Sequence, residues 1–229
     1  MVIFILIAFI VMSIAIDALI QYNRKKKSGI QVAPAAAFRV FNEALLSVPM
    51  GLYFDKTHTW AYMEKNGLVK IGIDDFLLHV TGPLNRVTMK AAGEKIQKGE
   101  AVFTVIKNGK QLNINSPVSG IIKSQNFRLL EDSTLINSSP FYEGWVYTIE
   151  PSNWVRETQF MFMADKYREW LKNEFVRLKD FLAGITQVNQ LEPAHIKYQD
   201  GGELTDHVLD SFGPEVWEEF QTRFIDTSR

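Results

Sequence analysis

Between Leu52 and Pro151, strong turn signals divide the chain into short runs of β-forming residues, and this pattern constrains the fold more than any other feature. The pairs Asn66-Gly67 and Asn108-Gly109 predict hairpin turns, because both central residues of a type I′ turn need positive φ angles. Short strands at this spacing predict a mainly β domain over residues 52–152, folded as a small sandwich or barrel.

Composition excludes several classes of function. The 229-residue chain contains no cysteine, which excludes disulfides, thiolate catalysis, iron–sulfur clusters and cysteine-bound zinc. Its net charge of −1 gives no general attraction to nucleic acid, so no nucleic-acid partner is expected. The sequence has no glycine-rich phosphate loop, dinucleotide fingerprint or hydrolase elbow, and nothing in it indicates an enzyme.

The start of the chain has the composition of a transmembrane anchor. In residues 1–20 only Ser13 and Asp17 interrupt the apolar character, and a helix of this length spans about 30 Å, the thickness of the hydrocarbon core. Basic residues follow this stretch, whereas a cleavable signal peptide carries its positive charge before it. A removed signal peptide and a buried core helix are the alternatives.

We therefore predict a single-pass anchor over residues 1–21 in the cell membrane, with the N-terminus outside and the soluble part in the cytoplasm. The residues expected to form and orient this anchor are Phe4, Leu6, Phe9, Arg24, Lys25, Lys26 and Lys27. Residues 22–51 are expected to be a linker with a short helix, which Pro34 begins and Pro49 and Gly51 end.

After Pro151 the apolar residues return to helical spacing. An amphipathic helix is predicted over residues 153–184, where Gly184 is expected to stop it. The tail over residues 185–229 is polar and is predicted to be extended and to bind a partner, with one short amphipathic helix that starts at Pro214. The side chains predicted to contact other protein subunits are Trp170, Phe181, Trp217 and Phe220.

Several motifs in the β-rich region resemble the glycine cleavage H protein, a member of the lipoyl-domain fold. They are Thr57-His58-Thr59-Trp60, Ile71-Gly72-Ile73-Asp74-Asp75-Phe76, Ala92-Gly93-Glu94-Lys95-Ile96-Gln97-Lys98-Gly99-Glu100, Pro117-Val118-Ser119-Gly120, Leu135-Ile136-Asn137 and Gly144-Trp145-Val146. The resemblance implies a flattened β-sandwich (hybrid barrel) with a hairpin that presents a lipoyl-lysine. The strand and turn pattern places the tip of this hairpin at Lys107-Asn108-Gly109-Lys110.

The chain departs from the family at the lysine that the resemblance implies to be lipoylated. Counting back from Pro117 without a gap puts Gly109 at that position, so that Lys110 lies one residue late and Lys107 two residues early. Side chains alternate between faces along a strand, and a shift of one residue therefore redirects the side chain. Ile106 replaces the family's acidic residue.

Two interpretations follow from this departure. In the first, the domain has lost its lipoyl arm and serves as a docking module without a cofactor. In the second, the hairpin bulges by one residue and Lys110 carries lipoate. A tight Asn-Gly turn leaves little room for a bulge, which favours the first.

The remaining polar residues predict structural roles. His58, His79, His195 and His207 lack metal-ligand spacing, and no metal site is expected. Asp74-Asp75 and Glu131-Asp132 are expected to form turns and caps.

The leading hypothesis is a non-catalytic scaffold or accessory subunit of a membrane-bound protein complex, and the lipoyl kinship prompts a respiratory or other redox complex. The rival hypothesis is a membrane-tethered lipoyl carrier modified at Lys110.

Overall fold

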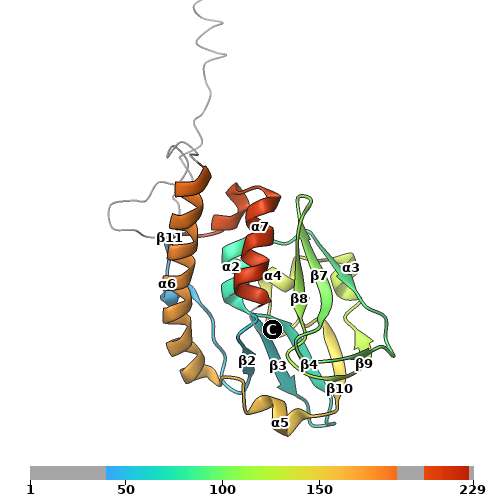
Figure 1. Cartoon of the computed structure of the whole chain (residues 1–229). Helices are drawn as coiled ribbons and strands as arrows, with labels where there is room; N and C mark the ends of the chain where they lie inside the picture. Colours follow the sequence, from blue (N-terminus) through green and yellow to red (C-terminus); the bar gives the residue numbers. More distant parts are fainter. Residues whose placement is uncertain (1–39, 190–203, 227–229) are drawn as a thin grey trace, which may run out of the picture. The chain divides into compact units, whose positions relative to one another are not determined.

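The computed structural model describes residues 40–189 and 204–226 (Figure 1). The anchor predicted over residues 1–21 and its basic flank lie outside the described residues. Within the two described ranges, no helix combines the length and apolar character that crossing a membrane requires. The anchor therefore stays a prediction.

Two antiparallel β-sheets form the centre of the described chain. The larger sheet contains β2 (Tyr53–Asp55), β3 (Thr59–Met63), β4 (Val69–Ile73), β10 (Tyr147–Pro151), β9 (Gly120–Gln125) and β6 (Lys95–Ile96), in that spatial order. The smaller sheet contains β5 (Arg86–Met89), β7 (Ala101–Lys107) and β8 (Lys110–Asn115). The helices α2 (Asp75–Thr81), α3 (Arg128–Glu131) and α4 (Leu135–Ser138) lie in the connections. The prediction of a β-rich domain built from short strands is confirmed for residues 53–151.

The two sheets pack against each other through their apolar faces. The ring centroids of Phe103 in β7 and Tyr147 in β10 lie 6.0 Å apart, and the Tyr147 hydroxyl donates a 3.0 Å hydrogen bond to the carbonyl of Val102. Along β8, Leu112 and Ile114 are fully buried, and the residues between and before them face outward. This period-two alternation gives each sheet one buried face.

The turn between β3 and β4 is longer than the sequence predicts. Only Gly67 of the Asn66-Gly67 pair has a positive φ angle (83°), and the backbone N–H of Glu64 donates a 2.8 Å hydrogen bond to the carbonyl of Leu68. The Asn66 side chain accepts a hydrogen bond from the N–H of Leu68, which supports this longer loop.

The helix predicted over residues 153–184 is two helices, α5 (Trp154–Thr158) and α6 (Ala164–Asn189). The break occurs because Phe162 forms a β-bridge with Phe54, in which each N–H donates a 2.8 Å hydrogen bond to the other's carbonyl. Gly184 does not end α6, which continues to Asn189. A glycine costs a helix about 1 kcal/mol relative to alanine, which weakens it without stopping it.

The structure corrects the prediction of an extended tail for residues 204–226. This C-terminal segment contains β11 (Leu204–Thr205), the short helix η2 (Val208–Ser211), α7 (Pro214–Phe220) and the π-helical turn η3 (Gln221–Ile225). The helix that Pro214 begins is present as α7, but Trp217 and Phe220 are buried. The apolar surface of this segment is therefore buried against the rest of the chain.

The short helix predicted within residues 22–51 is also corrected over its described part. Val40 and Phe41 form β1, which pairs with β11, and Glu43–Leu45 form the 3₁₀ turn η1. Phe41 packs on Phe175 of α6 with ring centroids 4.7 Å apart. Contacts of this segment with β11 and α6 therefore override the helical spacing of its apolar residues.

We expect that Trp217→Ala lowers the free energy of unfolding by about 3–5 kcal/mol, because it leaves a cavity in a closed core. Denaturant unfolding of the full chain in mild detergent measures this change. The matched control is Phe160→Ala, at an exposed position, which should change stability by less than about 0.5 kcal/mol. Equal stability of the two variants would contradict the packed position of α7.

Candidate functional site

The β7–β8 hairpin is the first candidate site, and its tip is the predicted Lys107-Asn108-Gly109-Lys110. Lys107 pairs directly with Lys110, and the two residues between them have positive φ angles of 50° for Asn108 and 82° for Gly109. These angles define the two-residue type I′ turn. The register irregularity of this hairpin lies at the other end, between Ala101 and Phe103. No bulge at the tip moves Lys110 to the apex.

The amine of Lys110 is held by the C-terminal segment. Its Nζ donates hydrogen bonds to the carbonyls of Asp210 (2.8 Å) and Phe212 (3.1 Å) and lies 5.1 Å from the centre of the Trp217 ring. Only 12% of the side chain is exposed. An amine in this position is enclosed by acceptors and an aromatic face of its own chain.

Lys107 is held in the same way and is more deeply buried. Its Nζ donates a 3.0 Å hydrogen bond to the carbonyl of Thr81 and forms a 3.0 Å ion pair with Asp210. A Cβ atom at Gly82 would lie 2.5 Å from this Nζ, so glycine provides the space for the lysine side chain. Because Lys107 and Lys110 are cross-strand partners, both extend from the same face of the hairpin.

The C-terminal segment also covers the outer edge of β8. The Gln221 side chain accepts a 2.8 Å hydrogen bond from the N–H of Asn113 and donates one of 3.0 Å to its carbonyl. The Asn115 amide donates to the carbonyl of Ile225. The amide of Gln221 thus satisfies backbone groups at the edge of β8, where a free edge could pair with a strand of another chain.

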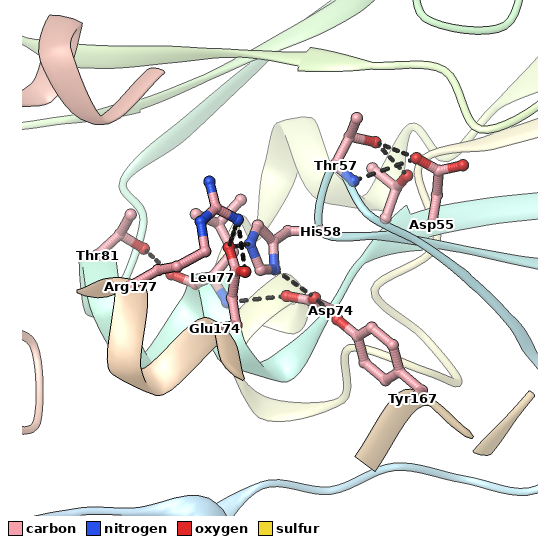
Figure 2. Close-up of polar contacts among 10 residues, drawn as sticks. Asp55, Thr57, His58, Asp74, Leu77, Thr81, Tyr167, Glu174 and Arg177 are labelled. Carbon is pink, nitrogen blue, oxygen red and sulfur yellow. Dashed lines mark hydrogen bonds and ion pairs between the residues drawn. The ribbon is translucent and has the colours of Figure 1, made fainter. Parts of the chain in front are cut away.

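A cluster of buried charged groups connects the larger sheet with α6 (Figure 2). His58 is fully buried; its Nδ1 lies 2.8 Å from a carboxylate oxygen of Asp74, and its Nε2 lies 3.4 Å from Glu174. The Tyr167 hydroxyl donates a hydrogen bond to the same Asp74 oxygen. Arg177 binds both oxygens of Glu174 at 2.8 and 2.6 Å. Each buried carboxylate therefore has a partner of opposite charge.

Local structure sets the position of His58. It occupies the left-handed region (φ 61°) in the tight turn between β2 and β3, where Asp55 accepts hydrogen bonds from the N–H and the hydroxyl of Thr57. Asp74 is the N-cap of α2 and accepts a 2.8 Å hydrogen bond from the N–H of Leu77. The predicted cap at Asp74 is confirmed, and the turn and the cap together direct His58 and Asp74 toward each other.

The charge state of His58 follows from these partners. Burial alone would lower the pKa of His58, but the carboxylates of Asp74 and Glu174 outweigh burial and raise the pKa to about 9. His58 is therefore protonated at neutral pH, with both ring nitrogens as donors. Burial, together with the charge of Asp74, raises the pKa of Tyr167 well above its usual value, so its hydroxyl stays protonated.

Comparison with known proteins identifies the family of this chain. The family model of the glycine cleavage H-protein matches residues 52–174, more than half of the chain. This chain belongs to the glycine cleavage H-protein family. The match begins at the predicted start of the β domain and extends beyond its predicted end, into α6 as far as Glu174.

Two relatives agree with this assignment by sequence. The chain is 34% identical over 122 residues to the glycine cleavage system H protein of Methylococcus capsulatus, covering 53% of this chain and 94% of the relative. It is 30% identical over 129 residues to that of Thermus thermophilus, covering 56% and 99%. The crystal structure of a glycine cleavage system H protein from Mycobacterium marinum covers 55% of this chain and 99% of its own, at 22% identity and a TM-score of 0.48.

The family motifs have clear physical roles in this member of the H-protein family. Gly72 pairs with Trp60 across the larger sheet, and a Cβ there would lie 2.6 Å from the indole ring. Ser119 of Pro117-Val118-Ser119-Gly120 donates its backbone N–H and its hydroxyl to Glu157 of α5 at 2.8 and 2.5 Å. His58 of the early motif is part of the buried cluster, in the structural role that the sequence predicted.

The other predicted residues have structural contacts or lie outside the described residues. The Nδ1 of His79 lies 2.8 Å from Asp206, Asp132 accepts hydrogen bonds from the N–H and hydroxyl of Thr134, as expected of a turn, and His195 lies outside the described residues. The described part of the chain contains no group of three metal-ligating side chains.

Three of the four side chains that were predicted to contact other subunits pack inside the chain instead. Phe181 packs on Phe220 and Phe224 with ring centroids 5.9 and 5.5 Å apart, and the Trp217 indole donates a 2.9 Å hydrogen bond to the carbonyl of Leu209. Trp170 is half-buried and stacks on Tyr167 and Phe162. The predicted subunit-binding role is corrected for Phe181, Trp217 and Phe220, because their side chains have no exposed surface to offer.

The buried partners of His58 were not predicted from the sequence. Glu174 lies among Leu171, Phe175 and Leu178 on the apolar stripe of α6, and its carboxylate is completely buried. An acidic residue at a core position of an amphipathic helix is the signal that indicates a buried positive partner.

We expect the stability that His58 contributes to depend on pH. A pKa raised from 6.5 to about 9 contributes on the order of 3 kcal/mol below pH 6.5, and this contribution is lost as pH rises through about 9. Denaturant unfolding of the full chain at pH 6.5 and pH 9.5 measures the loss. His58→Gln is the matched control, since it has no proton to lose. The same pH dependence in both proteins would show that the stabilising proton is not on His58.

Proposed function

We propose that this chain is a membrane-anchored, non-catalytic member of the glycine cleavage H-protein family that acts as an accessory or scaffold subunit of a membrane-associated protein complex and carries no lipoyl group. The observation that carries the proposal is the hairpin apex, where a glycine stands at the position of the family's modified lysine.

The lysines beside the apex support the same conclusion. Lipoylation needs a projecting amine that a modifying enzyme reaches, and the attached arm needs free space. The amines of Lys107 and Lys110 instead bind carbonyls of their own chain and Asp210. Releasing Lys110 would leave two carbonyl acceptors and the face of Trp217 without their partner.

The membrane part of the proposal is supported by the sequence of residues 1–27, with its apolar stretch followed by four basic residues within 24–27. In this proposal the N-terminus lies outside and the H-protein-like domain lies in the cytoplasm. About half of the chain lies outside the region that the relatives match, and these added parts distinguish it from a small mobile carrier. A respiratory or redox complex fits the lipoyl kinship of the domain.

Family membership favours one alternative, a membrane-tethered carrier with lipoate on Lys110. Intact-protein mass spectrometry of the chain from a lipoylating host separates the two. We expect the wild-type chain to be unmodified and the Gly109→Lys variant, which has an amine at the apex, to be lipoylated. A Cβ at Gly109 meets no atom within 4 Å, so the variant costs only the strain of a positive φ angle.

A lipoyl increment on the wild-type chain that disappears in Lys110→Arg would establish the carrier instead. An unmodified Gly109→Lys variant, together with an unmodified wild type, would show that the modifying enzyme does not recognise this domain at all. The absence of lipoate would then follow from this failure of recognition as well as from the missing lysine.

We further expect the full chain to stay with membranes after an alkaline wash and to be purified in mild detergent with partner subunits in fixed stoichiometry. An apolar stretch of 20 residues resists extraction, whereas a peripheral protein is released. Size-exclusion chromatography with mass spectrometry of the peak measures the composition. Recovery of the chain as a lone monomer would contradict the scaffold role.

A further inference from the structure

Several large apolar side chains are exposed close together in the sequence at the junction between α5 and α6. Val155 is 74% exposed, Phe160 69% and Met163 52%, and Met50, from the loop before β2, is 80% exposed. Met50 and Met163 line one groove together with Tyr53 and Thr158. Figure 1 shows α5 next to the first turns of α6. Large exposed apolar groups gathered in one place mark an interaction surface.

The charges that surround these side chains are mainly positive. Lys56, Arg156 and Lys166 are exposed, with Lys56 6.0 Å from the centre of the Phe162 ring and Lys166 in the wall of the groove. Of the two acids of this region, Glu157 is buried against Ser119, whereas Asp165 lies in the wall of the groove with its side chain 86% exposed and forms a 3.0 Å ion pair with Arg168, which adds a further positive charge. We call Met50, Val155, Phe160 and Met163 with Lys56, Arg156 and Lys166 the α5–α6 patch.

We propose that the α5–α6 patch contacts the surface of an anionic lipid bilayer, the same bilayer that holds the predicted anchor. Apolar side chains that enter the headgroup region beside basic residues are the chemistry of interfacial membrane binding. This inference rests on the proposed anchor, and it adds the face by which the domain meets the membrane.

The length of the chain allows this contact. Residues 28–39 separate the basic cluster from Val40, and twelve residues extend at most about 40 Å. The described chain begins beside Phe175 of α6, which Phe41 contacts, and the α6 start at Ala164 lies about 17 Å away along the helix axis. The patch is therefore within reach of a membrane to which residues 1–27 are fixed.

Because the chain contains no native cysteine, a single introduced cysteine carries a fluorescent label without background. The full chain is reconstituted into phosphatidylcholine–phosphatidylglycerol vesicles with the label at Met163→Cys or at Val176→Cys, a control position on α6 that is 57% exposed and outside the patch. Spin-labelled lipids then quench the fluorophore. We expect quenching about threefold stronger at position 163 than at 176, and a smaller difference in vesicles of phosphatidylcholine alone.

Equal quenching at the two positions, in protein that stays with the vesicles through an alkaline wash, would overturn the patch as a membrane contact while leaving the anchor intact. Protection of position 163 only when a co-purified protein is present would also overturn it, in favour of a protein partner. Loss of the chain from the vesicles in that wash would contradict the anchor itself.

Discussion

The buried positive charge of His58 is the interaction on which the rest of the described structure depends. It connects Asp74, which follows β4 and caps α2, with Glu174, which lies in the middle of α6. Arg177 extends the cluster to the C-terminal segment, because it donates a 2.7 Å hydrogen bond to the carbonyl of Arg223 and lies 4.9 Å from the Phe224 ring. Removal of one member leaves an uncompensated charge in the core, so this network fixes the three parts of the chain together.

That fixed arrangement determines what the hairpin does. With α6 in place, Phe181 provides the surface on which Phe220 and Phe224 pack, and the C-terminal segment then lies over β8 and both lysines. Burying an amine is costly without partners, and the carbonyls of Thr81, Asp210 and Phe212 supply them. The face of the hairpin that carries both lysines is therefore an internal contact surface of this chain.

The sequence predicts the β domain well because its signals are local. The Asn108-Gly109 turn, the cap at Asp74 and the start of α7 at Pro214 each depend on residues within one or two turns of chain, and the structure contains all three. The break between α5 and α6 was not predictable in this way. It depends on Phe54, which is more than a hundred residues away and uses the backbone of Phe162 as a strand partner.

The prediction of an extended C-terminal tail was wrong for a related reason. Residues 204–226 have too little apolar surface to form a core alone, so composition by itself predicts an unfolded or partner-bound segment. The missing core is provided by α6 and the hairpin, and Trp217 and Phe220 are buried there. Periodicity identified which side chains need an apolar surface, but it did not show whether that surface belongs to a partner or to the same chain.

The residues at the hairpin tip, Asn108 and Gly109, fit a tight turn better than a projecting side chain. Asn-Gly is the pair best suited to a type I′ turn, since both residues adopt positive φ angles at low cost, and the turn here has that geometry. A lysine at the position of Gly109 would add strain to the turn and is tolerated only where the projecting amine has a use. In this chain the hairpin is a packing element for the C-terminal segment. The buried amines of Lys107 and Lys110 and the covered edge of β8 both follow from that packing, and the Asn-Gly turn gives the hairpin a tip without strain.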